Sequence, residues 1–84
     1  MPLPSQPVTL TVEQLTELNG KLATMRHDLN NKLCVIAGSV EVIRIKPQSA
    51  QRMLETLLEQ SAGMAAAIKK YSDEFDRAFG ITRP

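Results

Sequence analysis

Two series of apolar residues at helical spacing, separated by a proline, most strongly limit what this chain can fold into. In each series the positions recur in alternating steps of three and four, as one face of an α-helix requires. Pro47 separates the two series, because proline disfavours a helical conformation at the residue before it. The sequence therefore predicts two long helices and no strands. The positions, here called the seams, are Leu15, Leu18, Leu22, Met25 and Leu29, and then Leu54, Leu57, Ser61, Met64, Ile68, Tyr71, Phe75 and Ala78.

Turn and cap signals divide the chain into an arm, a helical domain and a tail. Three prolines within residues 1–10 disfavour helix and predict an extended N-terminal arm. A single domain is expected over residues 11–80, with helices at about 11–45 and 50–79. Residues 81–84 remain as a C-terminal tail.

The expected ends of the helices carry capping residues. Thr11 and Gln14 have the spacing of a capping box at the start of the first helix. Ser49 is a candidate cap for the second helix, and Gly80 suits the position just past its end. Asn19-Gly20 is a weak point inside the first helix, but the seam continues in phase across it, which favours one helix over two.

The first seam slips by one residue after Leu29. The next position in phase is Lys32, whereas the apolar residues that follow are Leu33, Ile36, Val40 and Ile43. Such a slip predicts either a distorted helix or a change of packing just after the only histidine, His27.

The short connection around Pro47 predicts that the two helices lie antiparallel, with opposed residue numbers adding up to about 95. A hairpin of two helices leaves much of both seams exposed, and an exposed apolar patch of this size marks an interaction surface. The expected fold is therefore all-α: an antiparallel helical hairpin of two long helices, dimerising into a four-helix bundle.

Composition narrows the class of protein further. The chain has 84 residues with one tyrosine, two phenylalanines and no tryptophan, so the core is small and a homodimer would enlarge it. A formal net charge of +1 gives no indication of a nucleic-acid or membrane partner. Cys34 is the only cysteine, which excludes an internal disulfide and fits a reducing compartment. With no apolar run of about 18 residues and no secretion-signal pattern, a cytoplasmic protein is expected.

The residues with chemical potential lie on the side of the first helix opposite the seam. His27 and Asn31 are four apart and share this side, and Asp28 lies about 100° further round the helix. An exposed imidazole can attack a phosphoryl donor in line, and Asn31 can hold a phosphoryl oxygen or a water. Asp28 is placed to orient the ring from the side. The alternative is that all three are ordinary solvated residues, as a lone surface histidine usually is.

Two small residues continue this side of the helix. Gly38 follows His27 by eleven residues and either leaves a smooth patch for a partner backbone or allows close contact between helices. Cys34 is interpreted as a small apolar residue, because no second thiol is present for redox or metal chemistry. Four basic residues at a similar level can bring positive charge toward a phosphate or simply solvate their faces: Arg26, Lys32, Lys69 and Lys70.

Together these residues resemble the phosphoacceptor box of bacterial sensor histidine kinases. In that family an acidic residue follows the histidine, an asparagine or threonine lies four residues on, and leucine, isoleucine, glycine and glutamate recur at set spacings. The long helical hairpin is similar to the family's dimerisation and phosphoacceptor domain. The matching residues are His27-Asp28-Leu29-Asn30-Asn31, Leu33, Ile36, Gly38 and Glu41.

The resemblance implies roles for individual residues. His27 corresponds to the phosphoacceptor, Asp28 to its acid/base helper, and Asn31 to the residue that aids phosphatase or transfer chemistry. The implied partners are a response-regulator receiver domain, which would supply Mg²⁺, and a separate sensor kinase; no intrinsic cofactor or metal is implied. The residues expected to dock the receiver are Asn30, Cys34, Gly38, Glu41 and Ile45.

The chain departs from the family in two respects. Lys32 stands where many members have proline, and only four residues follow Gly80, so the ATP-binding domain is missing from this chain. An autonomous kinase is therefore not expected. The leading hypothesis is a histidine phosphotransfer module of a two-component phosphorelay, or a piece of a longer kinase. The alternatives are a non-catalytic dimeric adaptor that docks on a receiver or kinase, and a structural dimerisation stub.

Overall fold

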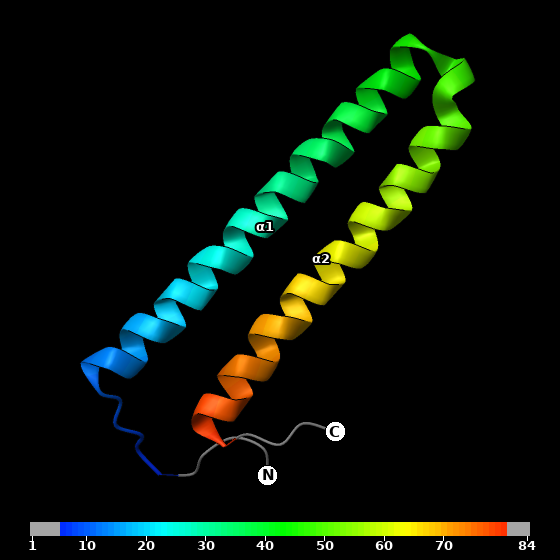
Figure 1. Cartoon of the computed structure of the whole chain (residues 1–84). Coiled ribbons are helices and arrows are strands. Elements are labelled where there is room, and N and C mark those ends of the chain that lie inside the picture. The colour runs from blue at the N-terminus through cyan, green and yellow to red at the C-terminus, as the bar shows by residue number, and fades with distance from the viewer. Residues whose placement is uncertain (1–5, 81–84) are drawn as a thin grey trace.

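The computed structural model describes residues 6–80 as two long helices that lie side by side and antiparallel (Figure 1). Helix α1 (Val12–Ile45) is followed by the short 3₁₀ helix η1 (Pro47–Ser49) and by α2 (Ala50–Phe79). The hairpin is extended, with principal dimensions of 57 × 28 × 13 Å. The prediction of an all-α antiparallel hairpin of two long helices is therefore confirmed. Parts of the expected arm and tail, residues 1–5 and 81–84, lie outside the described residues.

The start of α1 has the predicted capping box. The backbone N–H of Gln14 donates to the Thr11 hydroxyl at 3.0 Å, and the Gln14 side-chain oxygen accepts from the backbone N–H of Thr11 at 2.9 Å. At the other end of the hairpin, Ser49 occupies the predicted N-cap position of α2, but its side chain makes no cap hydrogen bond. Its backbone is already helical within η1, so the chain passes from one helical turn into the next. Gly80 ends α2 in the left-handed conformation, with φ of 63°.

We expect Thr11→Ala to lower the free energy of unfolding by about 1 kcal/mol, because one N–H in the first turn of α1 loses its partner. Urea unfolding followed by circular dichroism would measure the change. Thr9→Ala is the matched control, since Thr9 is exposed and precedes the helix. Equal stability of the two variants would contradict the prediction.

Two contacts between the helices establish their register. The Lys21 ammonium lies 3.3 Å from the Glu74 carboxylate, and the Lys32 side chain crosses directly over Gly63, where an added Cβ would lie 2.5 Å from the Lys32 Cε. Both pairs obey the predicted rule for opposed positions. With no side chain at Gly63, the Lys32 stem packs directly on α2.

The slip in the first seam does not break α1, which continues as one helix through both Asn19-Gly20 and Lys32. The polar residues Lys32 and Ser39 take positions on the side of α1 nearest α2, and Ser39 is 5% exposed. Leu33 and Val40 are displaced from this side and remain 49% and 52% exposed. The hairpin thus has polar residues between its helices and apolar residues outside them.

The exposed apolar side chains gather on one side of the hairpin. At about 100° per residue, the exposed leucines and valine of α1 lie about 100° round from Lys21 and Lys32, which meet α2. The exposed leucines and isoleucine of α2 are turned in the same sense from Gly63 and Glu74, by a larger angle. In antiparallel helices, turns in the same sense lead toward one side of the pair. Within residues 6–80 no large side chain is fully buried, so this extended surface indicates oligomerisation. We call it the apolar face: Leu15, Leu33, Val40, Leu54, Leu58 and Ile68.

The opposite side of the hairpin is more polar. Val35 and Val42 lie there, 43% and 37% exposed. On α2 this side carries mainly charged residues, including Arg52, Glu59 and Lys70. The two broad sides of the hairpin therefore differ in chemistry, and only one of them suits apolar packing.

Candidate functional site

His27 lies near the middle of α1 with an exposed side chain. Helix periodicity turns it away from α2, because the half-buried positions of α1 lie on the other side of the helix. The helical neighbours one turn before and after it are all exposed and uncharged: Ala23, Thr24, Asn30 and Asn31. The imidazole is therefore open to a partner, and no charged side chain of α1 stands one turn away on its side.

Asn31 holds the ring. Its amide nitrogen Nδ2 lies 3.2 Å from Nε2 of His27, across one helical turn. An amide N–H₂ group donates but does not accept, so Nε2 accepts this hydrogen bond with its lone pair. The structure thus joins the two residues that the spacing of four predicted to be neighbours.

Asp28 lies elsewhere. Its half-buried side chain lines a groove of about 170 Å³ between the helices, together with Lys21 and Met25 of α1 and Lys70 and Tyr71 of α2. Among the described residues, the His27 side chain makes a hydrogen bond to Asn31 and none to Asp28. The acid/base role of Asp28 stays a prediction, and in this conformation its carboxylate does not hold the ring.

The expected docking residues continue from His27 toward the connection. All five are exposed: Asn30, Cys34, Gly38, Glu41 and Ile45. We call the side of α1 formed by His27, Asn31 and these residues the histidine strip. Nothing lies within 4 Å of a Cβ placed on Gly38, so this glycine does not serve close packing between α1 and α2. Glu41 is paired with Arg44 within the helix, and Ile45 is 70% exposed.

The four basic residues expected near His27 lie in different places: Arg26 is exposed on α1 next to His27, whereas the three lysines face α2 or belong to it. Lys69 and Lys70 are level with His27 along the hairpin, but they belong to α2, whereas the imidazole faces away from that helix. The Lys69 ammonium donates to Asp73 at 2.8 Å, and this hydrogen bond together with the carboxylate charge raises the pKa of Lys69. Lys32 is packed on Gly63. In this conformation the three lysines fit the alternative that they solvate or pack on their own faces, and positive charge beside a phosphate on His27 stays a prediction.

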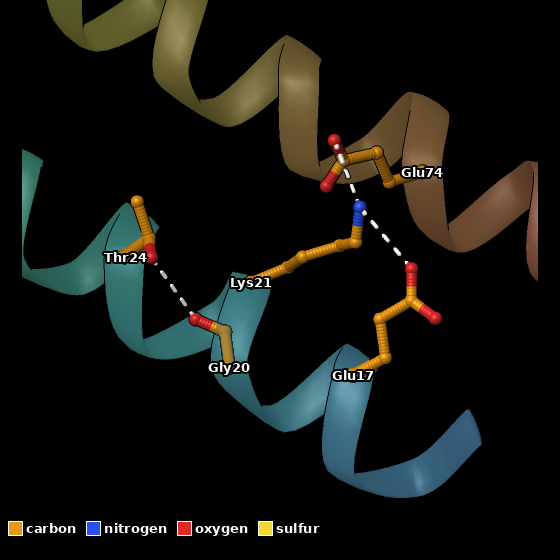
Figure 2. Close-up of polar contacts among 5 residues, drawn as sticks. All are labelled: Glu17, Gly20, Lys21, Thr24 and Glu74. Carbon is orange, nitrogen blue, oxygen red and sulfur yellow. Dashed lines mark hydrogen bonds and ion pairs between the residues drawn. The ribbon is translucent and has the colours of Figure 1, made fainter. Parts of the chain in front are cut away.

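Sequence reasoning missed a polar cluster between the helices. Figure 2 shows the Lys21 ammonium between two carboxylates, 3.6 Å from Glu17 of its own helix and 3.3 Å from Glu74 of α2. Beside it, the Thr24 hydroxyl donates to the carbonyl of Gly20 at 3.1 Å. The pairing rule for opposed positions already relates Lys21 to Glu74, so opposite charges at such positions were an available signal. The cluster joins the two helices and lies apart from the histidine strip.

Comparison of the chain with protein-family models, with characterised proteins and with solved structures gives no match. Within residues 6–80, no three histidine, cysteine, aspartate or glutamate side chains gather closely enough to hold a metal ion. Neither of the two described helices combines the length and the apolar character that a membrane span needs. The functional argument therefore depends on the geometry of the histidine strip.

Proposed function

We propose that this hairpin is a histidine phosphotransfer module of a two-component phosphorelay, in which His27 exchanges a phosphoryl group with an aspartate of a response-regulator receiver. The observation that supports this most directly is the exposed His27 ring, turned away from α2, whose Nε2 lone pair accepts only the hydrogen bond of the exposed Asn31 side chain among the described side-chain contacts. The resemblance of residues 27–41 to the phosphoacceptor box of sensor histidine kinases supports the same assignment.

The chemistry requires little from the hairpin beyond a positioned imidazole. The Nε2 lone pair attacks the phosphorus of the aspartyl phosphate, and the bond from phosphorus to the aspartyl oxygen breaks, releasing a carboxylate. Since the neighbours of His27 one turn away are uncharged, the partner must neutralise the phosphoryl oxygens. A receiver with its own Mg²⁺ would meet this need. The receiver would approach along Cys34, Gly38 and Ile45.

A homodimer is part of the proposal. In each helix, the mean direction of the seam lies between the direction of the other helix and that of the apolar face. This is the direction of the centre of a four-helix bundle. A second hairpin on the apolar face would bury Leu33, Leu58 and Ile68, which are now about half exposed or more. His27 would stay outside, because it points away from both neighbours.

The test is direct phosphoryl transfer. The protein is incubated with a receiver phosphorylated on its aspartate, and separately with a sensor kinase and ATP. Intact-mass measurement should show one added phosphoryl group that is lost in acid, as expected for phosphohistidine, and fragmentation should place it on His27. Absence of this group with both donors, across several receivers, would contradict the proposal.

The position of Asp28 favours a second candidate function. Because its carboxylate faces the groove and no cation lies on the histidine strip, the hairpin also fits a non-catalytic adaptor that docks on a receiver or a sensor kinase. In that case His27→Gln should leave both partner binding and biological output intact. Under the phosphorelay proposal, the same variant still binds but loses the output.

Gly38→Trp should weaken receiver binding by at least about tenfold, because a large side chain on the histidine strip prevents close approach of the partner. Titration calorimetry would measure the affinity, and circular dichroism would check the fold. Thr16→Trp is the matched control, since Thr16 is exposed on the same side of α1, eleven residues before His27. Wild-type affinity in Gly38→Trp would contradict docking along the histidine strip. A wild type that binds no receiver, with both variants folded and still oligomeric, would favour a structural dimerisation stub.

A further inference from the structure

The contact between Asn31 and His27 bears on which ring nitrogen carries the proton. The two atoms joined at 3.2 Å are Nδ2 of Asn31 and Nε2 of His27. The amide nitrogen can only donate, so with this group facing the ring the contact is a hydrogen bond when Nε2 is unprotonated and the proton of the neutral ring is on Nδ1. Asp28, the nearest carboxylate in the sequence, lines the groove on the α2 side and so leaves Asn31 to orient the ring.

We propose that Asn31 is a positioning residue that fixes the neutral His27 ring in the Nδ1–H tautomer and so selects Nε2 as the nucleophile. The tautomer is proposed from the Asn31–His27 contact of the free protein. Only the consequence for reactivity rests on the proposed phosphotransfer function. This role goes beyond holding a phosphoryl oxygen, because Asn31 acts before any donor arrives.

The transfer step is consistent with this arrangement. The lone pair of Nε2 forms the bond to the phosphorus of an acyl phosphate, and the acyl oxygen leaves with the electrons of its bond to phosphorus. Nδ1 keeps its proton during the attack, and the resulting cationic ring then loses that proton to water, which reaches this exposed strip. The Asn31 N–H must leave Nε2 as phosphorus approaches. Since the two residues remain one helical turn apart, the same N–H can then donate to a phosphoryl oxygen.

The experiment observes the tautomer by ¹⁵N NMR of imidazole-labelled protein at pH about 9, where an ordinary imidazole is neutral. The wild type should show mainly the Nδ1–H form. In Asn31→Ala the ratio of Nδ1–H to Nε2–H should fall by about two- to tenfold, the effect of losing one ordinary hydrogen bond. In Asn31→Asp the ratio should reverse, because a carboxylate accepts from Nε2–H. Asn19→Ala is the matched control, because Asn19 is an exposed asparagine of α1 that lies outside the histidine strip.

Two outcomes would overturn the proposal: a wild-type ring that is mainly Nε2–H, or a ratio that stays the same in both Asn31 variants. Asn31 is exposed, and circular dichroism would verify that each variant keeps its helices. The phosphorylated protein provides a second readout, since the wild type should carry phosphorus on Nε2. If the tautomers behave as expected but no phosphoryl group is ever accepted, the phosphotransfer function fails and the positioning role of Asn31 stands.

Discussion

The double substitution Leu33→Glu and Leu58→Glu is expected to convert the protein from a folded oligomer into a largely unfolded monomer. The two leucines are 49% and 73% exposed in the single hairpin, and a four-helix bundle would bury both. Burying a leucine side chain contributes about 1.5–3 kcal/mol, and placing a carboxylate in such a core costs more. The loss occurs at both positions in every copy, so it should exceed the stability of a small domain, about 5–15 kcal/mol.

The structure gives the reason for so large an effect. The described part of the hairpin has no large side chain that is fully buried, and the space between its helices contains the polar residues Lys21, Asp28, Lys32 and Ser39. Little apolar burial is left to stabilise a lone hairpin once the apolar face is disrupted. Light scattering would report the mass, and thermal melting at several protein concentrations would report stability, which should rise with concentration in the wild type.

A matched double variant separates this effect from a general intolerance of glutamate. Val35→Glu and Ile45→Glu introduce the same two carboxylates on α1, at positions that are 43% and 70% exposed and lie away from the apolar face. This control should keep its mass and most of its stability. Similar behaviour of the two double variants, or a wild type that is monomeric at every concentration, would contradict the proposed bundle.

The fold could be predicted because its determinants are local. Alternating steps of three and four, Pro47 and the Thr11 capping box are each readable within a few residues, and the pairing of Lys21 with Glu74 follows from the short connection. What could not be read was which seam residues meet α2. The side of a helix on which apolar residues gather reflects every neighbour that covers it. The pattern therefore cannot distinguish packing against α2 of the same chain from packing against a second copy. Leu33 and Val40 are examples, since they continue the apolar pattern of α1 and yet are 49% and 52% exposed in the single hairpin.

The candidate site shows the same limit. The link between His27 and Asn31 was predictable, because residues four apart on a helix are neighbours whatever surrounds them. Whether the Asp28 side chain faces the His27 ring or the groove depends on where α2 lies. The spacing of residues in the sequence did not decide between these two directions. Lys69 lies at the same height along the hairpin as His27, as expected. The height of a residue does not determine which side of the hairpin it faces.

His27→Ala is expected to abolish phosphoryl labelling completely, whichever donor is used. His27 is the only histidine in the chain, so no other imidazole can form a bond from nitrogen to phosphorus. His27→Gln should be equally unlabelled while still binding a receiver, because it keeps a polar side chain on an exposed strip. The measurement is the intact mass after incubation with a phosphorylated receiver or with a sensor kinase and ATP, before and after acid treatment.

Cys34→Ser is the matched control for this prediction, because the exposed thiol of Cys34 is a competing nucleophile on the same histidine strip. Its labelling should equal that of the wild type if the imidazole is the acceptor. A phosphoryl group that survives in His27→Ala but disappears in Cys34→Ser would transfer the acceptor role to the thiol. If the phosphoryl group is lost in both His27→Ala and Cys34→Ser, labelling depends on both side chains. Acid lability of the wild-type label would then identify the atom that carries phosphorus. Only a loss confined to the His27 variants agrees with the outward-facing imidazole of His27 as the acceptor.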